Sequence, residues 1–313
     1  ITRQAAYVSG SGSGALLFRY TVQSGDNDSD GIAIGVLAAN GGSLRDSASN
    51  DALVTLNSVG ATNAVLVDAL ISAISSVSVP NTAHKVGDTI TATITVSSDS
   101  DDYTTGSGGI SGTIAGYALG SLSKINNTTY TATFTMTDGG TDVAAGSNIP
   151  VNFTLTDSVG NTGSAYTAAI SQSSDALYAN LPDVDLTASS NTIAENGGNS
   201  ILTATLSGSL NNQWPIDIAV NLAYSGTATA ITDFTKADGI TISAGNSTGT
   251  SIVTGVADML YDAALSETVI VDISSVSVGN EGGLNQQMIS ITDAESAPTV
   301  SLSVGSNTIL ESG

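Results

Sequence analysis

Apolar and polar residues alternate with a period of two in the regular stretches of this chain. In 89–96, TITATITV, every second residue is apolar and threonines lie between. Three more stretches alternate: 17–22 (LFRYTV), 130–137 (YTATFTMT) and 216–222 (IDIAVNL). This period is typical of β-strands with one buried face. The residues predicted to face inward are Phe18, Tyr20, Val22, Ile90, Ala92, Ile94, Val96, Tyr130, Ala132, Phe134, Met136, Ile216, Ile218, Val220 and Leu222.

No stretch shows a helical period, and clusters of Gly, Asn, Asp and Ser between the alternating runs are typical of turns. We therefore expect an all-β chain of short antiparallel strands. With 313 residues it is long enough for two to three domains.

Two internal repeats divide the chain. Residues 182–197 (PDVDLTASSNTIAENG) align without a gap with 298–313 (PTVSLSVGSNTILESG), with nine of sixteen positions identical at an offset of 116. Residues 44–51 (LRDSASND) align with 155–162 (LTDSVGNT) at an offset of 111. Both offsets fit one β-sandwich domain per repeat.

These repeats predict a tandem array of antiparallel β-sandwiches of the immunoglobulin-like, Greek-key type. We expect four parts: the C-terminal part of an incomplete sandwich (1–69), a complete sandwich (70–181), a second complete sandwich (182–293), and a linker with the first strand of a further repeat (294–313). On this interpretation the sequence is a window cut from a longer array, because a lone strand needs partner strands.

Composition narrows the class of protein. Only 11% of residues are charged, yet the net charge is −22, while 41% of residues are hydrophobic, which excludes a disordered acidic tail. The field has the wrong sign for nucleic acid or anionic lipid and attracts cations. No apolar run is long enough to span a bilayer, so we expect no membrane insertion in this segment. Without cysteine, disulfides and thiol chemistry are excluded.

The domain at 182–293 resembles the Calx-beta family. The phrases that carry the resemblance occur in the family's order: VDLTASSNTIAENGG, YSGTATAITDF, ITISAGNSTGT and ETVIVDISSV. The domain at 70–181 resembles the bacterial immunoglobulin-like (cadherin-like) repeats of giant surface proteins, through HKVGDTITATITV and LTDSVGNTGSAY, and FRYTVQSGDNDSDGIAI is similar to the end of a related repeat. The resemblance implies a bacterial adhesin or surface filament whose modules commonly bind calcium.

The sharpest local signal for a metal is DNDSDG, in which Asp26, Asp28 and Asp30 precede Gly31. Closely spaced carboxylates repel one another without a cation, and calcium needs several hard oxygen ligands. Leu37 occupies the twelfth position, where an EF-hand has an acidic residue, so the EF-hand interpretation fails. A calcium-favouring turn and a solvated acidic hairpin turn remain.

The Calx-beta resemblance implies a second calcium site at the loops of one end of the sandwich. The matching acidic residues are Glu195, Asp233, Asp258 and Asp293, and Glu295 is a further candidate. The family's consecutive aspartates are reduced here to ADMLYD (Asp258 and Asp262) and DAE. The alternative is that these acids cap turns.

Other singled-out residues favour structural roles. Asp46 and Asp157 in the repeated L-x-D-S phrase are expected to stabilise turns through their own backbone. His84, the only histidine, is expected at a surface turn, and Trp214, the only tryptophan, at the end of a sandwich core.

The leading hypothesis is a structural segment of a large secreted or cell-surface bacterial protein, an adhesin stalk, filament or surface layer stiffened by calcium at acidic loops and domain junctions. Its partners would be neighbouring repeats of the same chain, or identical chains in a fibre or layer. One alternative is a module that binds glycans or cells; another is a filament subunit that polymerises by strand donation through 298–313. An enzyme is not expected, because one His and no Cys leave no recognisable site.

Overall fold

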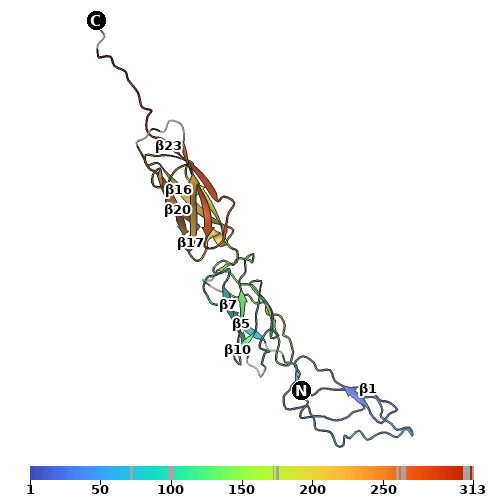
Figure 1. Ribbon diagram of the computed structural model, residues 1–313. Coiled ribbons are helices and arrows are strands. Elements are labelled where there is room, and N and C mark those ends of the chain that lie inside the picture. The colour runs from blue at the N-terminus through green and yellow to red at the C-terminus, as the bar shows by residue number, and fades with distance from the viewer. Residues whose placement is uncertain are drawn as a thin grey trace. The chain divides into compact units, whose positions relative to one another are not determined.

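The computed structural model describes residues 1–70, 73–97, 102–171, 173, 176–258, 261, 266–305 and 311. In these residues the regular structure is β-strand apart from one 3-10 turn, η1 (Leu210–Asn212). The prediction of an all-β protein of immunoglobulin-like β-sandwiches is confirmed. The chain divides into two compact units. Figure 1 shows the ribbon coloured along the chain, with β1 toward the N-terminal end of the sequence and β23 toward the C-terminal end. Unit 1 comprises Ile1–Pro80, Thr91–Phe134 and Pro150–Ile170, and unit 2 comprises Asn81–Ile90, Thr135–Ile149 and Ser171–Gly313. The four domain ranges expected from the repeats stay a prediction.

The first part of unit 1 has two small antiparallel ribbons. One pairs β1 (Ala6–Ser9) with β2 (Leu17–Arg19), and the other pairs β3 (Asn27–Asp28) with β4 (Val67–Asp68). The buried face predicted for LFRYTV is wrong, because Phe18 is 38% and Val22 46% exposed. Two-stranded ribbons without a second layer bury little apolar surface.

The rest of unit 1 is built on two sheets. One has the order β10-β11-β7-β5 and the other β12-β8-β9. The rings of Tyr117 and Phe134, one from each sheet, stack with centroids 6.1 Å apart. The inward residues predicted in 89–96 and 130–137 are all buried, as expected from their alternation. The strands are β5 (Ile74–Ser78), β7 (Thr89–Val96), β8 (Ile110–Ile114), β9 (Tyr117–Ala118), β10 (Ser123–Asn126), β11 (Thr129–Thr135) and β12 (Val151–Leu155).

Most of unit 2 is a sandwich of two five-stranded sheets, with orders β18-β20-β16-β14-β22 and β15-β23-β21-β17-β19. Its core includes Trp214, which is 1% exposed, so the predicted core position of this residue is confirmed. Ile216 is exposed rather than buried, because β17 begins only at Ile218. The strands are β14 (Asp183–Ala188), β15 (Thr192–Ala194), β16 (Asn199–Ser207), β17 (Ile218–Gly226), β18 (Phe234–Thr235), β19 (Gly239–Ile242), β20 (Thr248–Gly255), β21 (Glu267–Val276), β22 (Asn280–Glu281) and β23 (Gln286–Thr292).

His84 is not at a surface turn, and that expectation is wrong. It is buried in β6 (His84–Lys85), which pairs in parallel with β13 (Leu177–Tyr178). The sequence offers no local sign of this pairing, because the partner strand lies more than 90 residues away along the chain.

The repeated L-x-D-S phrase folds into the same turn at both of its positions in unit 1. The Oδ1 atom of Asp46 accepts hydrogen bonds from the amides of Ala48 and Asn50, and its Oδ2 accepts one from the Asn50 side chain. Asp157 accepts the same three bonds from Val159 and Asn161. The prediction that both aspartates stabilise turns is therefore confirmed.

Among the described residues, no helix has the length and apolar character needed to cross a membrane. After β23 the described residues 293–305 contain no strand. Residues 306–310, 312 and 313 of the repeated phrase lie outside the described residues.

Candidate metal centre

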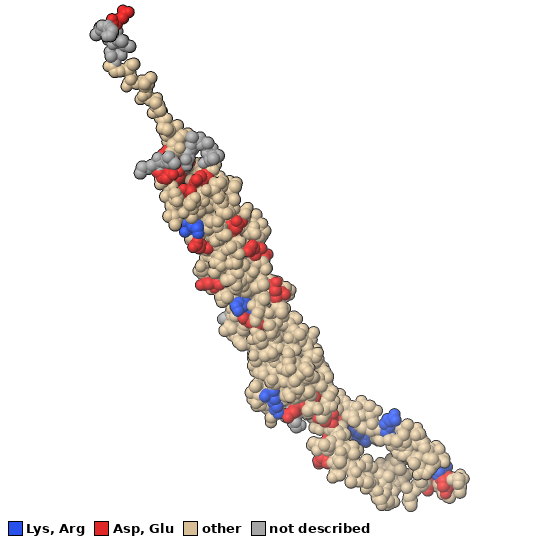
Figure 2. All heavy atoms as spheres, in the orientation of Figure 1, with Lys and Arg blue, Asp and Glu red and all other residues tan. Residues whose placement is uncertain are grey.

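Three acidic residues of unit 2 come together where β15 and β23 end. The two strands pair in parallel with Ala194 opposite Thr292, so Glu195 and Asp293 follow neighbouring strand ends. The amide of Glu195 donates to the carbonyl oxygen of Thr292 at 3.1 Å, which fixes the two loops to each other. Figure 2 shows carboxylates gathering at this end of the sandwich.

The side chains of Glu195, Asp293 and Glu295 converge within this loop pair. One carboxylate oxygen from each lies within 4.8 Å of the other two, and all three residues are half-buried. The loop backbone orients two of them: the amide of Ala294 donates to Glu195 Oε1 at 3.3 Å, and that of Glu295 to Asp293 Oδ1 at 2.7 Å. Among the described residues, no other group of three or more acidic or histidine side chains approaches this closely.

The cluster perturbs the ionisation of Glu295. A hydrogen bond to the Glu195 carboxyl group, followed by burial and the negative charges of Glu195 and Asp293, raises the pKa of Glu295 to about 7. Its Oε2 atom is buried and has no hydrogen-bond partner among the residues that the structure describes. Three carboxylates at this spacing repel one another, so a proton or a cation stabilises the arrangement.

The donor set fits a hard divalent cation. Calcium takes six to eight oxygen ligands at about 2.3–2.6 Å, and carboxylates with added water satisfy it. Three carboxylates are fewer than a high-affinity site uses, which corresponds to the weak extracellular class of calcium site. The orphaned Oε2 of Glu295 is an oxygen that a cation in this position would satisfy.

The other two residues implied by the Calx-beta resemblance lie outside this group. Asp233 caps a turn, because its Oδ2 accepts the amide of Thr229 at 2.5 Å. Asp258 is described but does not join the three, and Asp262 lies outside the described residues. The metal-binding role of all five residues stays a prediction.

The DNDSDG loop of unit 1 uses its aspartates separately. Asp26 is buried and accepts hydrogen bonds from the Arg3 guanidinium group, the Tyr20 hydroxyl and the Gln23 amide. The bond from Tyr20, followed by that from Gln23, lowers the pKa of Asp26 to about 2. Asp28 instead accepts the amide of Gly31 at 2.9 Å.

Asp26, Asp28 and Asp30 therefore do not converge as metal ligands among the described residues. The sequence analysis missed Arg3 because its ion pair with Asp26 joins residues far apart along the chain, and no local motif predicts such a pair.

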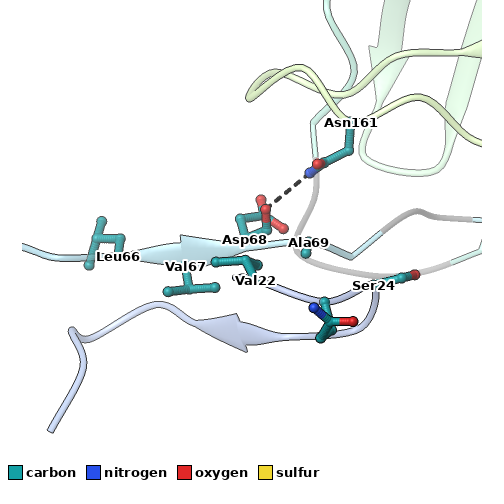
Figure 3. Close-up of a pocket in the computed structure, with 8 residues that line it drawn as sticks. Val22, Ser24, Leu66, Val67, Asp68, Ala69 and Asn161 are labelled. Carbon is teal, nitrogen blue, oxygen red and sulfur yellow. Dashed lines mark hydrogen bonds between the residues drawn. The ribbon is translucent and has the colours of Figure 1, made fainter. Parts of the chain in front are cut away.

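An open hollow of about 500 Å³ lies beside this loop in unit 1 (Figure 3). Its walls combine Val22 and Leu66 with the polar side chains of Gln23 and Asp68. The side chain of Asn161 also lines the hollow, and its Nδ2 donates to the Asp68 carbonyl oxygen at 3.1 Å.

The sequence analysis did not single out two further carboxylates that make defined hydrogen bonds. Asp138 and Asp142 of unit 2 lie four residues apart, and each accepts a main-chain amide from the segment 179–181. Local sequence carries no signal for these bonds.

Comparison with known proteins identifies no family. No protein-family model matches the chain, and no curated protein matches it, so the Calx-beta resemblance remains an interpretation of the sequence. Among solved structures, the chain is similar to the adhesin FdeC of Escherichia coli, with 15% identity over 72% of this chain and 67% of that one and a TM-score of 0.39.

Two other solved structures are similar at lower scores. Domains 5–6 of the S-layer protein SbsC share 14% identity over 72% of this chain and all of that one, with a TM-score of 0.21. The collagen adhesin CNA of S. aureus shares 11% identity over 70% of this chain and 92% of that one, with a TM-score of 0.17. Scores this low carry no argument, and the function rests on the geometry of the chain itself.

Proposed function

We propose that this chain is a structural segment of an extracellular or cell-surface protein of the adhesin, filament or surface-layer kind, and that calcium stabilises one end of its second unit. The observation that carries the proposal is the convergence of Glu195, Asp293 and Glu295 at the ends of β15 and β23. The chain leaves the sandwich through this cluster, so a bound cation would tie the outgoing segment to the domain.

The electrostatic balance supports a role for cations. The chain has 28 acidic residues against 6 basic ones, and five of the six basic side chains already pair with aspartates. Few carboxylates can therefore be neutralised from within the chain. In an extracellular setting, millimolar calcium supplies the missing positive charge.

A structural role also agrees with the apolar segment that follows the cluster. Val300, Leu302 and Val304 alternate along it and are 98%, 97% and 83% exposed. The counterparts of Val300 and Leu302 in β14, at the offset of 116, are Val184 and Leu186, which are buried in a sandwich core. We infer that the partner of this segment is the sheet of a neighbouring repeat in the same long chain.

The calcium part is tested by thermal unfolding of the full chain in 5 mM CaCl₂ and in EGTA, followed by the fluorescence of Trp214. At calcium tenfold above Kd, one site adds about 1.4 kcal/mol to the folded state. For a unit of this size that raises the midpoint by about 3–5 °C.

The matched variants are Asp293→Asn, which removes a carboxylate of the cluster, and Asp217→Asn, a turn carboxylate whose Oδ1 accepts the amide of Ala244. The calcium-dependent rise should vanish in the first and persist in the second. A wild-type chain whose midpoint is the same in calcium and EGTA would exclude calcium binding at this cluster.

A further inference from the structure

The first residues of the segment 176–181 of unit 2 are held by main-chain hydrogen bonds on both sides. On one side the amides of His84 and Val86 donate to the carbonyl oxygens of Ala176 and Tyr178, at 2.8 and 3.0 Å. On the other side Leu177 exchanges two bonds with Val143, at 2.8 and 3.1 Å. Connecting segments usually run over the surface and are more mobile than the strands they join, whereas this one is paired on both sides.

Two carboxylates complete the pairing where the strand partners end. Asp142 Oδ1 accepts the amide of Ala179 at 2.7 Å, and Asp138 Oδ1 accepts the amide of Leu181 at 2.8 Å. The Asn180 side chain donates to the carbonyl oxygen of Gly140, which lies between the two aspartates, at 3.2 Å. The loop 138–142 therefore fastens residues 179–181 from one side, and charge-assisted bonds of this kind are the stronger class.

The fastened segment covers part of the hydrophobic core of the 182–293 sandwich. Tyr178 meets Trp214 edge to face, with ring centroids 5.8 Å apart and planes at 67°. Tyr178, Leu181 and Val86 all pack against the core cluster that contains Trp214. An indole that is 1% exposed must lose this cover if the segment moves away.

We propose that Asp138 and Asp142 act as a metal-independent clamp that holds the segment 176–181 over Trp214. Each carboxylate keeps its negative charge and is stabilised by the main-chain amide bond that it accepts, so the clamp needs no cation to form. In the Glu195–Asp293–Glu295 cluster, two of the carboxylates also accept main-chain amides, but the three carboxylates converge on one another as well. The clamp does not depend on calcium binding at that cluster. Hydrogen bonds within the chain alone would hold the segment that leads into the 182–293 sandwich.

The test uses acrylamide quenching of the single tryptophan in the full chain. In the double variant Asp138→Ala/Asp142→Ala, the quenching constant of Trp214 should rise at least twofold, because the cover is no longer fastened. In Asp185→Ala it should stay at the wild-type value. Asp185 is the matched control: it also accepts a main-chain amide, that of Leu284 at 3.0 Å, and its removal changes the charge in the same direction.

The wild-type chain supplies the second measurement, which needs no variant to fold. Hydrogen exchange at the amides of Ala179 and Leu181 should be slow in EGTA and unchanged by 5 mM CaCl₂. Fast exchange in EGTA that calcium slows would overturn the proposal, as would wild-type quenching in the folded double variant. Either result leaves the calcium test at Asp293 unaffected, because that test reads the unfolding midpoint and its dependence on calcium.

Discussion

Asn50→Ala and Asn161→Ala, made one at a time, test the repeated L-x-D-S turn where it is exposed and where it is buried. Both side chains donate from Nδ2 to the Oδ2 of the turn aspartate, at 2.9 Å in the first copy and 2.8 Å in the second. Both residues keep their main-chain amide bond to Oδ1 after substitution. The difference between the variants therefore reports the surroundings of the turn and not its geometry.

The structure gives the expected size of that difference. Asn50 and Asp46 are exposed, so water replaces the lost bond at a cost of about 0.5 kcal/mol. Asp157 is 3% exposed, and its carboxylate would lose a partner that water cannot readily replace, which costs about 2 kcal/mol. Asn161 also loses its bond to the Asp68 carbonyl oxygen, worth about a further 0.5–1 kcal/mol. We expect Asn161→Ala to cost about 2 kcal/mol more than Asn50→Ala.

Scanning calorimetry of the full chain measures both variants in the same unit. The transition of unit 1 is the one without a change in tryptophan fluorescence, since Trp214 belongs to unit 2. At about 3 °C per kcal/mol for a unit of this size, Asn161→Ala should lower that midpoint by about 6–9 °C and Asn50→Ala by less than about 2 °C. Equal shifts would refute the reasoning, because they would show that burial of the Asp157 turn and its bond to Asp68 contribute nothing.

Three further outcomes are expected. Acidification from pH 5 to pH 2 should lower the thermal midpoint of unit 1 less in Asp26→Asn than in the wild type. The pKa of Asp26 is about 2 in the folded chain and 3.8 for an ordinary aspartate, so its ionised form contributes its full stability above pH 3.8 and loses it as the pH falls through 2. Gly112→Ala should lower the free energy of unfolding in urea by about 3 kcal/mol or more, because Gly112 has φ +136° and an added Cβ would lie 2.2 Å from a carbonyl oxygen. Gly116→Ala, also at positive φ but with open space around the Cβ position, should lower it by about 1–2 kcal/mol. Trp214→Ala should cost about 3–5 kcal/mol in the calcium-free unfolding of unit 2, and a loss below about 1 kcal/mol would contradict its place in the core.

The sequence predicts the structure well where the deciding interactions are local. The alternation around Ile94 and Phe134 is enough to identify the buried face of β7 and β11, because successive side chains of a strand point to opposite faces. The turn aspartates are equally predictable, since Asp46 and Asp157 bond to groups two and four residues ahead. The confirmed β-sandwich fold follows from repeating such local patterns.

Prediction fails where a partner comes from far along the chain. Alternation at Phe18 is as regular as at Phe134, but its strand lies in a two-stranded ribbon that no sheet covers among the described residues. His84 becomes buried through pairing with Leu177, and Asp26 through an ion pair with Arg3. The pattern of a strand shows which face is apolar, but it does not show whether anything covers that face.

The acidic residues illustrate the same limit, and they connect it to function. Asp142 and Asp293 are both loop aspartates in an acidic chain, and the sequence does not show which groups their carboxylates contact. Each carboxylate accepts a main-chain amide, but the carboxylate of Asp293 also lies beside those of Glu195 and Glu295. A carboxylate that faces a donor stabilises the fold without a cation, whereas carboxylates that face each other destabilise it until a proton or cation arrives. A net charge of −22 therefore does not translate into uniform calcium dependence. We expect calcium to stabilise the Glu195–Asp293–Glu295 cluster, whereas the clamp of Asp138 and Asp142 on the segment 176–181 should hold in EGTA, so that calcium affects the order of the first site and not of the second.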